Sequence, residues 1–124
     1  MSKLRNKIRR VLNSSLLPRN HVFADAAYDA KTGKAVVGIV LKDLSDSEYK
    51  FIKASSINEA ELKAVQMARA KFPTLKVATD SAYAVAHSDP DEVYWVPRKK
   101  NIANLIVRSA MEMARSHVEH NVAT

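Results

Sequence analysis

A change in hydrophobic period near residue 55 is the feature that most limits how this chain can fold. Before it, apolar and β-branched segments separated by short turns predict strands, the first of which has an apolar run ending at Asp25. After it, apolar residues recur at helical spacing, interrupted by two more short strand-like segments. The first predicted strand begins at residue 21 and ends at Asp25, and the others cover 35–41, 49–54, 74–79 and 93–97. The predicted helices cover 55–72, 80–87 and a segment from 101 onward.

Hairpin strands followed by βα units predict an α/β fold. We expect a five-stranded mixed sheet, in the chain order βββαβαβα, with helices on both faces. Gly33, in the turn "KTGK", is expected to take a positive φ, and Gly38, inside a strand, indicates a bulge or a close backbone approach. The apolar face predicted for the last helix consists of Ile102, Leu105, Ile106, Ala110 and Met113.

The 124 residues, 47% of them hydrophobic, fit one compact domain that buries about two-thirds of its unfolded surface. We assign residues 21–124 to this domain and residues 1–20 to a basic N-terminal arm. The chain has no cysteine, which excludes disulfides, zinc–thiolate sites and a thiol nucleophile. No apolar run approaches the roughly 20 residues of a membrane span, and no secretory signal is present, so we expect no membrane partner.

The formal net charge of +7 is concentrated in the arm. Residues 1–19 contain no acid but six basic residues, namely Lys3, Arg5, Lys7, Arg9, Arg10 and Arg19. Subtracting these six from the 20 basic residues leaves 14 against 13 acidic residues, so the remainder of the chain is nearly neutral. The arm suits a polyanion, because neutralised phosphates release counterions. A helix is predicted there from the apolar spacing of Leu4, Ile8, Val11 and Leu12.

Two other interpretations of the arm stay open. It could be a solvated surface helix without a partner. It could also be a mitochondrial presequence, because it is basic, contains serine and lacks acids. We expect a cytoplasmic protein, with a mitochondrial location as the alternative if the arm is a presequence. We also expect a monomer.

Three acids stand out by their positions along the predicted elements. Asp25 is expected at the end of the first strand, Asp80 at the end of the fourth, and Glu61 in the first turns of the long helix. If the first and fourth strands are neighbours, Asp25 and Asp80 emerge side by side, and the helix that crosses the sheet can bring Glu61 to them. Taken alone, Asp25 could also be an ordinary turn acid.

The helical period places Glu61 on the inward face of its helix. The residues three, four and seven positions after it are Ala64, Val65 and Ala68. A lone carboxylate is costly to bury unless a cation or a proton accompanies it. Three carboxylates that converge would repel one another, and hard oxygen ligands of this kind select Mg²⁺ or Mn²⁺.

Two of these acids also have purely structural interpretations. Asp80 could cap the helix that follows it. Glu61 could close a capping box with Asn58, since Asn-x-x-Glu has the required spacing. Ser56 and Glu59 form a competing box that would leave Glu61 free.

In this order and spacing, the sequence resembles the ribonuclease H family, in the type 1 branch that includes reverse-transcriptase-like domains. The resemblance runs from about Val22 to Ala114. The first hairpin, which carries the first aspartate (Asp25), is matched by "VFADAAYDAKTGKAVVGIVL", and the Glu-Leu helix segment, with Glu61, is matched by "NEAELKAV". The third acidic motif, with Asp80, is matched by "ATDSAYAV", and the last strand and loop are matched by "WVPRKKN".

The resemblance implies a metal-dependent endonuclease that hydrolyses the RNA strand of RNA–DNA hybrids. It implies two Mg²⁺ or Mn²⁺ ions, with Asp25 as the shared ligand and with Glu61 and Asp80 each favouring one ion. Cleavage is then expected to be nearly independent of base sequence. The substrate contacts that it implies are Asn58, Ser81, Arg98, Lys99 and Lys100.

The sequence departs from the family pattern at two places. The first aspartate is followed by Ala26 and Ala27 instead of glycine and a small polar residue. No acid lies between Arg98 and Arg108, where the family has its fourth carboxylate, and the nearest candidate in register is Asn104. An asparagine carbonyl can still ligate a metal or orient a water molecule, but it adds no negative charge.

These departures keep two other functions open. The first is a nucleic-acid-binding module that retains the fold around a degenerate site. The second is another nuclease on the same fold, such as a resolvase or an exonuclease.

Overall fold

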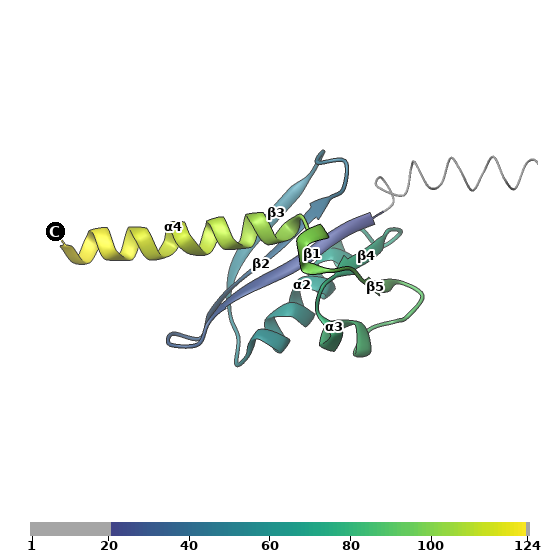
Figure 1. The fold of residues 1–124 in the computed structure, drawn as a ribbon, viewed down its shortest axis with the longest axis horizontal. Helices are drawn as coiled ribbons and strands as arrows, with labels where there is room; N and C mark the ends of the chain where they lie inside the picture. The colour runs from purple at the N-terminus through teal and green to yellow at the C-terminus, as the bar shows by residue number, and fades with distance from the viewer. Residues whose placement is uncertain (1–20, 124) are drawn as a thin grey trace, which may run out of the picture.

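The computed structural model describes the backbone of residues 21–123 and the side chains of residues 21–116. The predicted basic helix and the domain boundary at residue 20 therefore lie outside the described residues. Each strand and helix predicted for the described part is present (Figure 1). The elements are β1 (His21–Asp29), β2 (Lys34–Leu41), β3 (Ser47–Lys53), α2 (Ile57–Lys71), β4 (Lys76–Thr79), α3 (Ala82–Ala86), β5 (Val93–Trp95), the 3₁₀ helix η2 (Arg98–Lys100) and α4 (Ala103–Ala123).

The five strands form one mixed sheet in the order β3-β2-β1-β4-β5. The hairpin strands β1, β2 and β3 pair antiparallel, whereas β4 is parallel to β1 and β5 is parallel to β4. The turn between β1 and β2 contains Gly33 at φ 73°, as predicted for "KTGK". The predicted mixed α/β architecture is confirmed.

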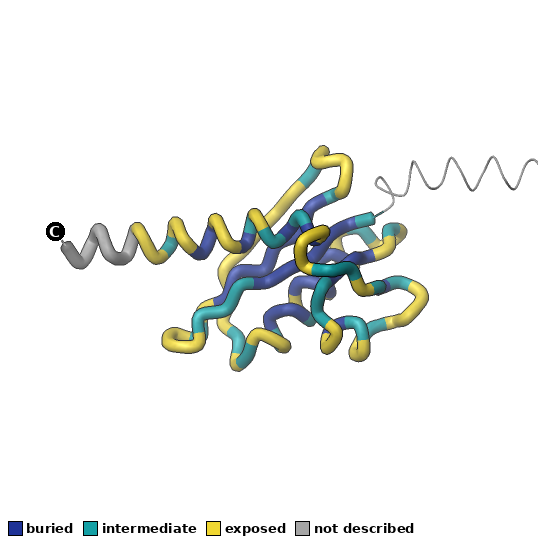
Figure 2. Tube along the Cα trace, in the orientation of Figure 1, coloured by how far each residue is buried: buried dark blue, intermediate teal, exposed yellow. Residues whose placement is uncertain are grey.

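The central strand β1 is buried on both sides. Its side chains alternate between two cores: Val22, Ala24 and Ala26 pack on the α2 side, and Phe23 packs under the start of α4. Figure 1 shows α4 across one face of the sheet and α2 behind it, and Figure 2 shows the buried centre between them. Helices on both faces are therefore confirmed.

Gly38 in β2 allows α4 to approach the sheet closely. Its pairing with Asp25 on one side and with Tyr49 on the other continues the register of both ladders, so there is no bulge. A Cβ atom at this position would lie only 2.7 Å from Cγ1 of Val107 in α4. Of the two alternatives for Gly38, the close approach is the observed one. It brings the first turn of α4, with Asn104, above Asp25.

The face that α4 turns toward the sheet differs in part from the predicted one. Leu105 and Met113 are 70% and 60% exposed, so their assignment to the buried face was wrong. The buried residues of the helix are Ala103, Val107, Ala110 and Met111. The buried face is turned about the helix axis relative to the predicted one, because Val107 packs against the sheet at Gly38, which the pattern of large apolar residues does not reveal. Within residues 21–123, no helix is long and apolar enough to cross a membrane.

Candidate functional site

The parallel pairing of β1 and β4 brings Asp25 and Asp80 together. The register pairs Val22 with Val77 and Phe23 with Ala78, and two further steps along it place Asp25 beside Asp80. The expectation that Asp25 ends its strand was wrong, because β1 continues to Asp29. The strand that ends here is β4, at Thr79, and its end leaves room beside Asp25.

Helix α2 supplies the third carboxylate. Glu61 is 6% exposed and shares its face with the buried residues Ala64, Val65 and Ala68, as the helical period predicted. One oxygen each from Asp25, Glu61 and Asp80 lies within 4.8 Å of the other two. The predicted convergence of the three acids is therefore confirmed.

Serines, and not these acids, cap the two helices. The Ser56 hydroxyl oxygen accepts a hydrogen bond from the Glu59 backbone N–H at 3.1 Å and caps α2, which leaves Glu61 free. The Ser81 hydroxyl oxygen accepts one from the Ala84 backbone N–H at 3.0 Å and caps α3. The capping interpretations of Glu61 and Asp80 are therefore set aside.

The carboxylate cluster contains buried oxygens without partners. Among the described residues, Oδ1 of Asp25 and Oε2 of Glu61 are buried and accept no hydrogen bond. Burial, followed by the charge of Asp25, raises the pKa of Glu61 to about 9. Burial also raises the pKa of Asp25, and the charge of Asp80 adds to this effect.

These features fit a divalent cation. Unsatisfied buried acceptors cost about 1–3 kcal/mol each, and a cation would relieve both this cost and the mutual repulsion of the carboxylates. The donors are all carboxylate oxygens, which suit Mg²⁺ and Mn²⁺ better than softer metals. Asp25, Glu61 and Asp80 are the residues that could hold such an ion.

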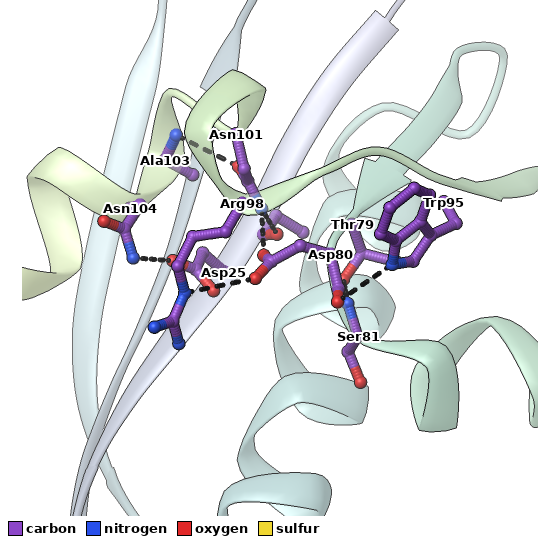
Figure 3. Close-up of polar contacts among 10 residues, drawn as sticks. Asp25, Thr79, Asp80, Ser81, Trp95, Arg98, Asn101, Ala103 and Asn104 are labelled. Carbon is purple, nitrogen blue, oxygen red and sulfur yellow. Dashed lines mark hydrogen bonds and ion pairs between the residues drawn. The ribbon is translucent and has the colours of Figure 1, made fainter.

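Asn101 is a site residue that the sequence analysis missed. It is 2% exposed, and its Nδ2 donates to the Ala24 carbonyl oxygen at 2.9 Å and to Oδ1 of Asp80 at 2.7 Å (Figure 3). Its Oδ1 accepts from the Ala103 backbone N–H at 3.2 Å, at the start of α4. Asn101 thus ties β1, Asp80 and α4 together. An asparagine just before an apolar helix is a signal for a cap, but it does not indicate the other two contacts.

Asn104 lies at the position that register assigned to the missing fourth acid. Its Nδ2 donates a hydrogen bond to Oδ2 of Asp25 at 2.8 Å (Figure 3). In this arrangement the amide acts on Asp25 as a donor, and this hydrogen bond lowers the pKa of Asp25, opposing the effect of burial. Asn104 therefore belongs to the cluster, and it adds no negative charge to it.

Comparison with protein families agrees with this geometry. The sequence matches the family model described as RNase H over residues 18–122. The chain belongs to the RNase H family. A comparison with curated proteins found no match. The order of acids along the chain, the sheet topology and the convergence of the carboxylates are thus those of an RNase H-family domain.

The residues expected to contact substrate in this RNase H-family domain differ in how exposed and how available their side chains are. Nε of Arg98 lies 3.5 Å from Oδ2 of Asp80, and the Arg98 side chain is 75% exposed. Lys99 and Lys100 are exposed beside it in η2, and Asn58 is exposed in the first turn of α2. The hydroxyl oxygen of Ser81 is engaged in the α3 cap, so this side chain is the least available of the set.

Trp95 borders the same site and is exposed. Its side chain is 54% exposed, and its Nε1–H donates to the backbone oxygen of Asp80 at 3.1 Å (Figure 3). This hydrogen bond fixes the indole ring at the end of β5 and helps to hold the backbone of Asp80 in place.

Proposed function

We propose that this chain is a metal-dependent endonuclease that hydrolyses the RNA strand of RNA–DNA hybrids. Membership of the RNase H family supports nuclease chemistry of this kind. The observation that carries the proposal is the buried cluster of Asp25, Glu61 and Asp80, in which two oxygens have no partner among the described residues. Such a cluster is costly to a protein that makes no use of a cation.

In the proposed mechanism, the three carboxylates hold Mg²⁺ or Mn²⁺. A divalent ion bound there would activate a water molecule and neutralise charge on the phosphate. Asn104 fixes the orientation of Asp25, and Asn101 fixes that of Asp80, so both carboxylates are oriented before an ion arrives. The site needs no nucleophilic side chain from the protein.

In the proposed complex, Arg98, Lys99 and Lys100 contact phosphates next to the carboxylates, and Asn58 reaches the substrate from the α2 side. Arg98 would exchange its ion pair with Asp80 for a phosphate when metal neutralises the carboxylate. Recognition of the hybrid would depend on backbone shape and the 2′-hydroxyl, which makes cleavage nearly independent of base sequence.

A substrate panel tests this proposal. Purified protein with Mg²⁺ or Mn²⁺ is incubated with an RNA–DNA hybrid, duplex DNA, duplex RNA and branched DNA. We expect cleavage of the hybrid within the RNA strand and about a 10³-fold loss in Asp25→Asn, which removes a metal-binding charge but keeps the shape of the side chain. Cleavage of branched DNA would indicate a resolvase, and digestion from strand ends an exonuclease. Full activity of Asp25→Asn would refute the assignment of the site.

Asn104 favours one second candidate, a binding module whose site has lost its catalytic function. The position carries an amide that hydrogen-bonds Asp25, where the family pattern has a carboxylate. Mg²⁺ titration by calorimetry separates the two functions, since a degenerate site would show no binding in the millimolar range. Asn104→Asp adds the missing charge, and we expect it to tighten Mg²⁺ binding about tenfold. A binding module would gain no cleavage from this change.

A further inference from the structure

A polar groove lies along the seam between β1 and α4, beyond the carboxylates. Its volume is about 170 Å³, and it is lined by Ala27, Tyr28, Arg108, Met111, Glu112 and Arg115. Arg108 and Arg115 are exposed, and neither makes an ion pair with another residue of the described part of the chain. We call this feature the α4 groove.

The α4 groove begins two residues along β1 from Asp25 and one helical turn along α4 from Asn104. Ala27 lies two residues after Asp25 on the same face of β1, a rise of about 7 Å. Arg108 lies one helical turn after Asn104, a rise of about 6 Å. Asn104 and Asp25 are hydrogen-bonded at 2.8 Å, and the groove is lined by the residues that follow each of them, so strand and helix leave this contact in the same direction. Arg115 lies about 10 Å farther along the helix.

The charges along the α4 groove favour an anion. Two guanidinium groups face one carboxylate, Glu112, and the structure contains no ion pair between Glu112 and either Arg108 or Arg115. Guanidinium groups bind phosphate oxygens in a bidentate manner, which sets the position of the phosphate as well as its affinity. Exposed, unpaired arginines at this spacing fit two phosphates of the same nucleic-acid strand.

We propose that the α4 groove binds the backbone of the strand that is cleaved, on one side of the scissile phosphate, with Arg108 and Arg115 as substrate-positioning residues. This inference rests on the proposed nuclease function. A strand whose scissile phosphate lies at Asp25 continues into the α4 groove in one direction. In the other direction it meets the cations of η2, residues 98–100. The metal site therefore lies between two separate groups of phosphate contacts.

The test compares three variants with the wild-type chain. In the double variant Arg108→Gln/Arg115→Gln, we expect the salt dependence of hybrid binding to weaken by about two units of log K per log salt, because two phosphate contacts are lost. The KM for hybrid cleavage should rise about tenfold or more, with kcat nearly unchanged. Arg69, which is also exposed and lies in the last turn of α2, provides the matched control: Arg69→Gln should change neither quantity. Glu112→Gln should tighten binding.

A second measurement determines on which side of the cleavage position the α4 groove contacts the strand. Hybrids are shortened by three nucleotides on either side of a defined cleavage position. The penalty of the double variant should disappear for hybrids shortened on one side and persist for those shortened on the other. Equal penalties on both sides, or a salt slope and KM equal to those of wild type, would overturn the inference and leave the α4 groove a solvated helix face. A wild-type chain that neither binds nor cleaves hybrids would instead overturn the proposed function, and this inference with it.

Discussion

The two helices that cover the sheet bring different chemistry to Asp25. From α2 comes Glu61, a buried carboxylate whose pKa is raised to about 9 by burial and by the charge of Asp25. From the α4 side come two amides, Asn104 on Asp25 and Asn101 on Asp80, which donate hydrogen bonds at 2.8 and 2.7 Å. On the α2 side, Glu61 and Asp25 repel each other when both are ionised, and a cation can relieve this repulsion. On the α4 side, the two amides fix the orientation of the carboxylates. Substitutions on the two sides should therefore change the stability of the metal-free protein in opposite directions, although both reduce cleavage.

The largest effect is expected from Glu61→Gln. We expect a loss of cleavage of about 10²–10³-fold, because one of three metal-binding charges is removed. Without metal, the same change should raise the free energy of unfolding at pH 7 by roughly 1–3 kcal/mol, since the buried acid no longer has to be kept protonated. Thermal unfolding in EDTA measures the second effect, and hybrid cleavage with Mg²⁺ measures the first.

Glu59→Gln is the matched control on the same helix. The side chain of Glu59 is 39% exposed and contacts Lys63 and Ser55, away from the cluster, so this variant should keep full cleavage and show no increase in melting temperature. If Glu61→Gln lowered the melting temperature in EDTA instead of raising it, the α2 side would not be a source of repulsion.

Asn101→Ala tests the opposite side and should have the next largest effect. The change leaves Asp80 and the Ala24 carbonyl without their donor, and we expect it to destabilise the protein by about 1–3 kcal/mol. Because Asp80 is then free to turn, Mg²⁺ affinity and cleavage should each fall about 10–100-fold. Calorimetric titration with Mg²⁺ provides a measurement that does not depend on activity.

Val107→Ala separates positioning from stability. Val107 is fully buried in α4 and its side chain cannot hydrogen-bond the carboxylates, so truncating it should destabilise the protein while Mg²⁺ affinity stays close to that of wild type. Equal losses of Mg²⁺ affinity in Val107→Ala and Asn101→Ala would mean that Asn101 only contributes to stability.

The sequence could predict the α2 side of this comparison but not the α4 side. Glu61 could be placed inward because Ala64, Val65 and Ala68 repeat at helical spacing behind it, which is local information. The order of strands and helices along the chain also followed from local periods, because hairpins and βα units have different hydrophobic spacing. Short-range patterns thus sufficed wherever an element's own period decides what it buries.

The contacts of Asn101 could not be predicted, because its partners lie 77 and 21 residues away in the chain. The position of Asp25 within β1 was also wrong, since the length of that strand is set by pairing with β2, which continues to Asp29. On α4, contact with the sheet decides which side chains are buried: Val107 packs against Gly38, whereas Leu105 lies on the exposed side of the helix. All three depend on distances between elements, which single-sequence periodicity does not contain.

The last expected effect is the pH dependence of stability, to which the α2 side contributes through Glu61. The folded-state pKa of Glu61, about 9, exceeds its ordinary value of 4.5, so the folded protein binds more protons than the unfolded chain between these values. Stability without metal should therefore fall as pH rises from about 4.5 to about 9, and be fully retained below that window. Saturating Mg²⁺ should flatten or reverse this slope, because the cation favours the ionised carboxylates.

Melting temperatures measured in EDTA between pH 5 and 9 should decline more steeply for wild type than for Glu61→Gln. Asn101→Ala should start from a lower melting temperature and decline with the wild-type slope. If the melting temperatures of wild type and Glu61→Gln declined equally with pH, Glu61 would not be a source of repulsion. The proposed difference between the α2 side and the α4 side would then be wrong.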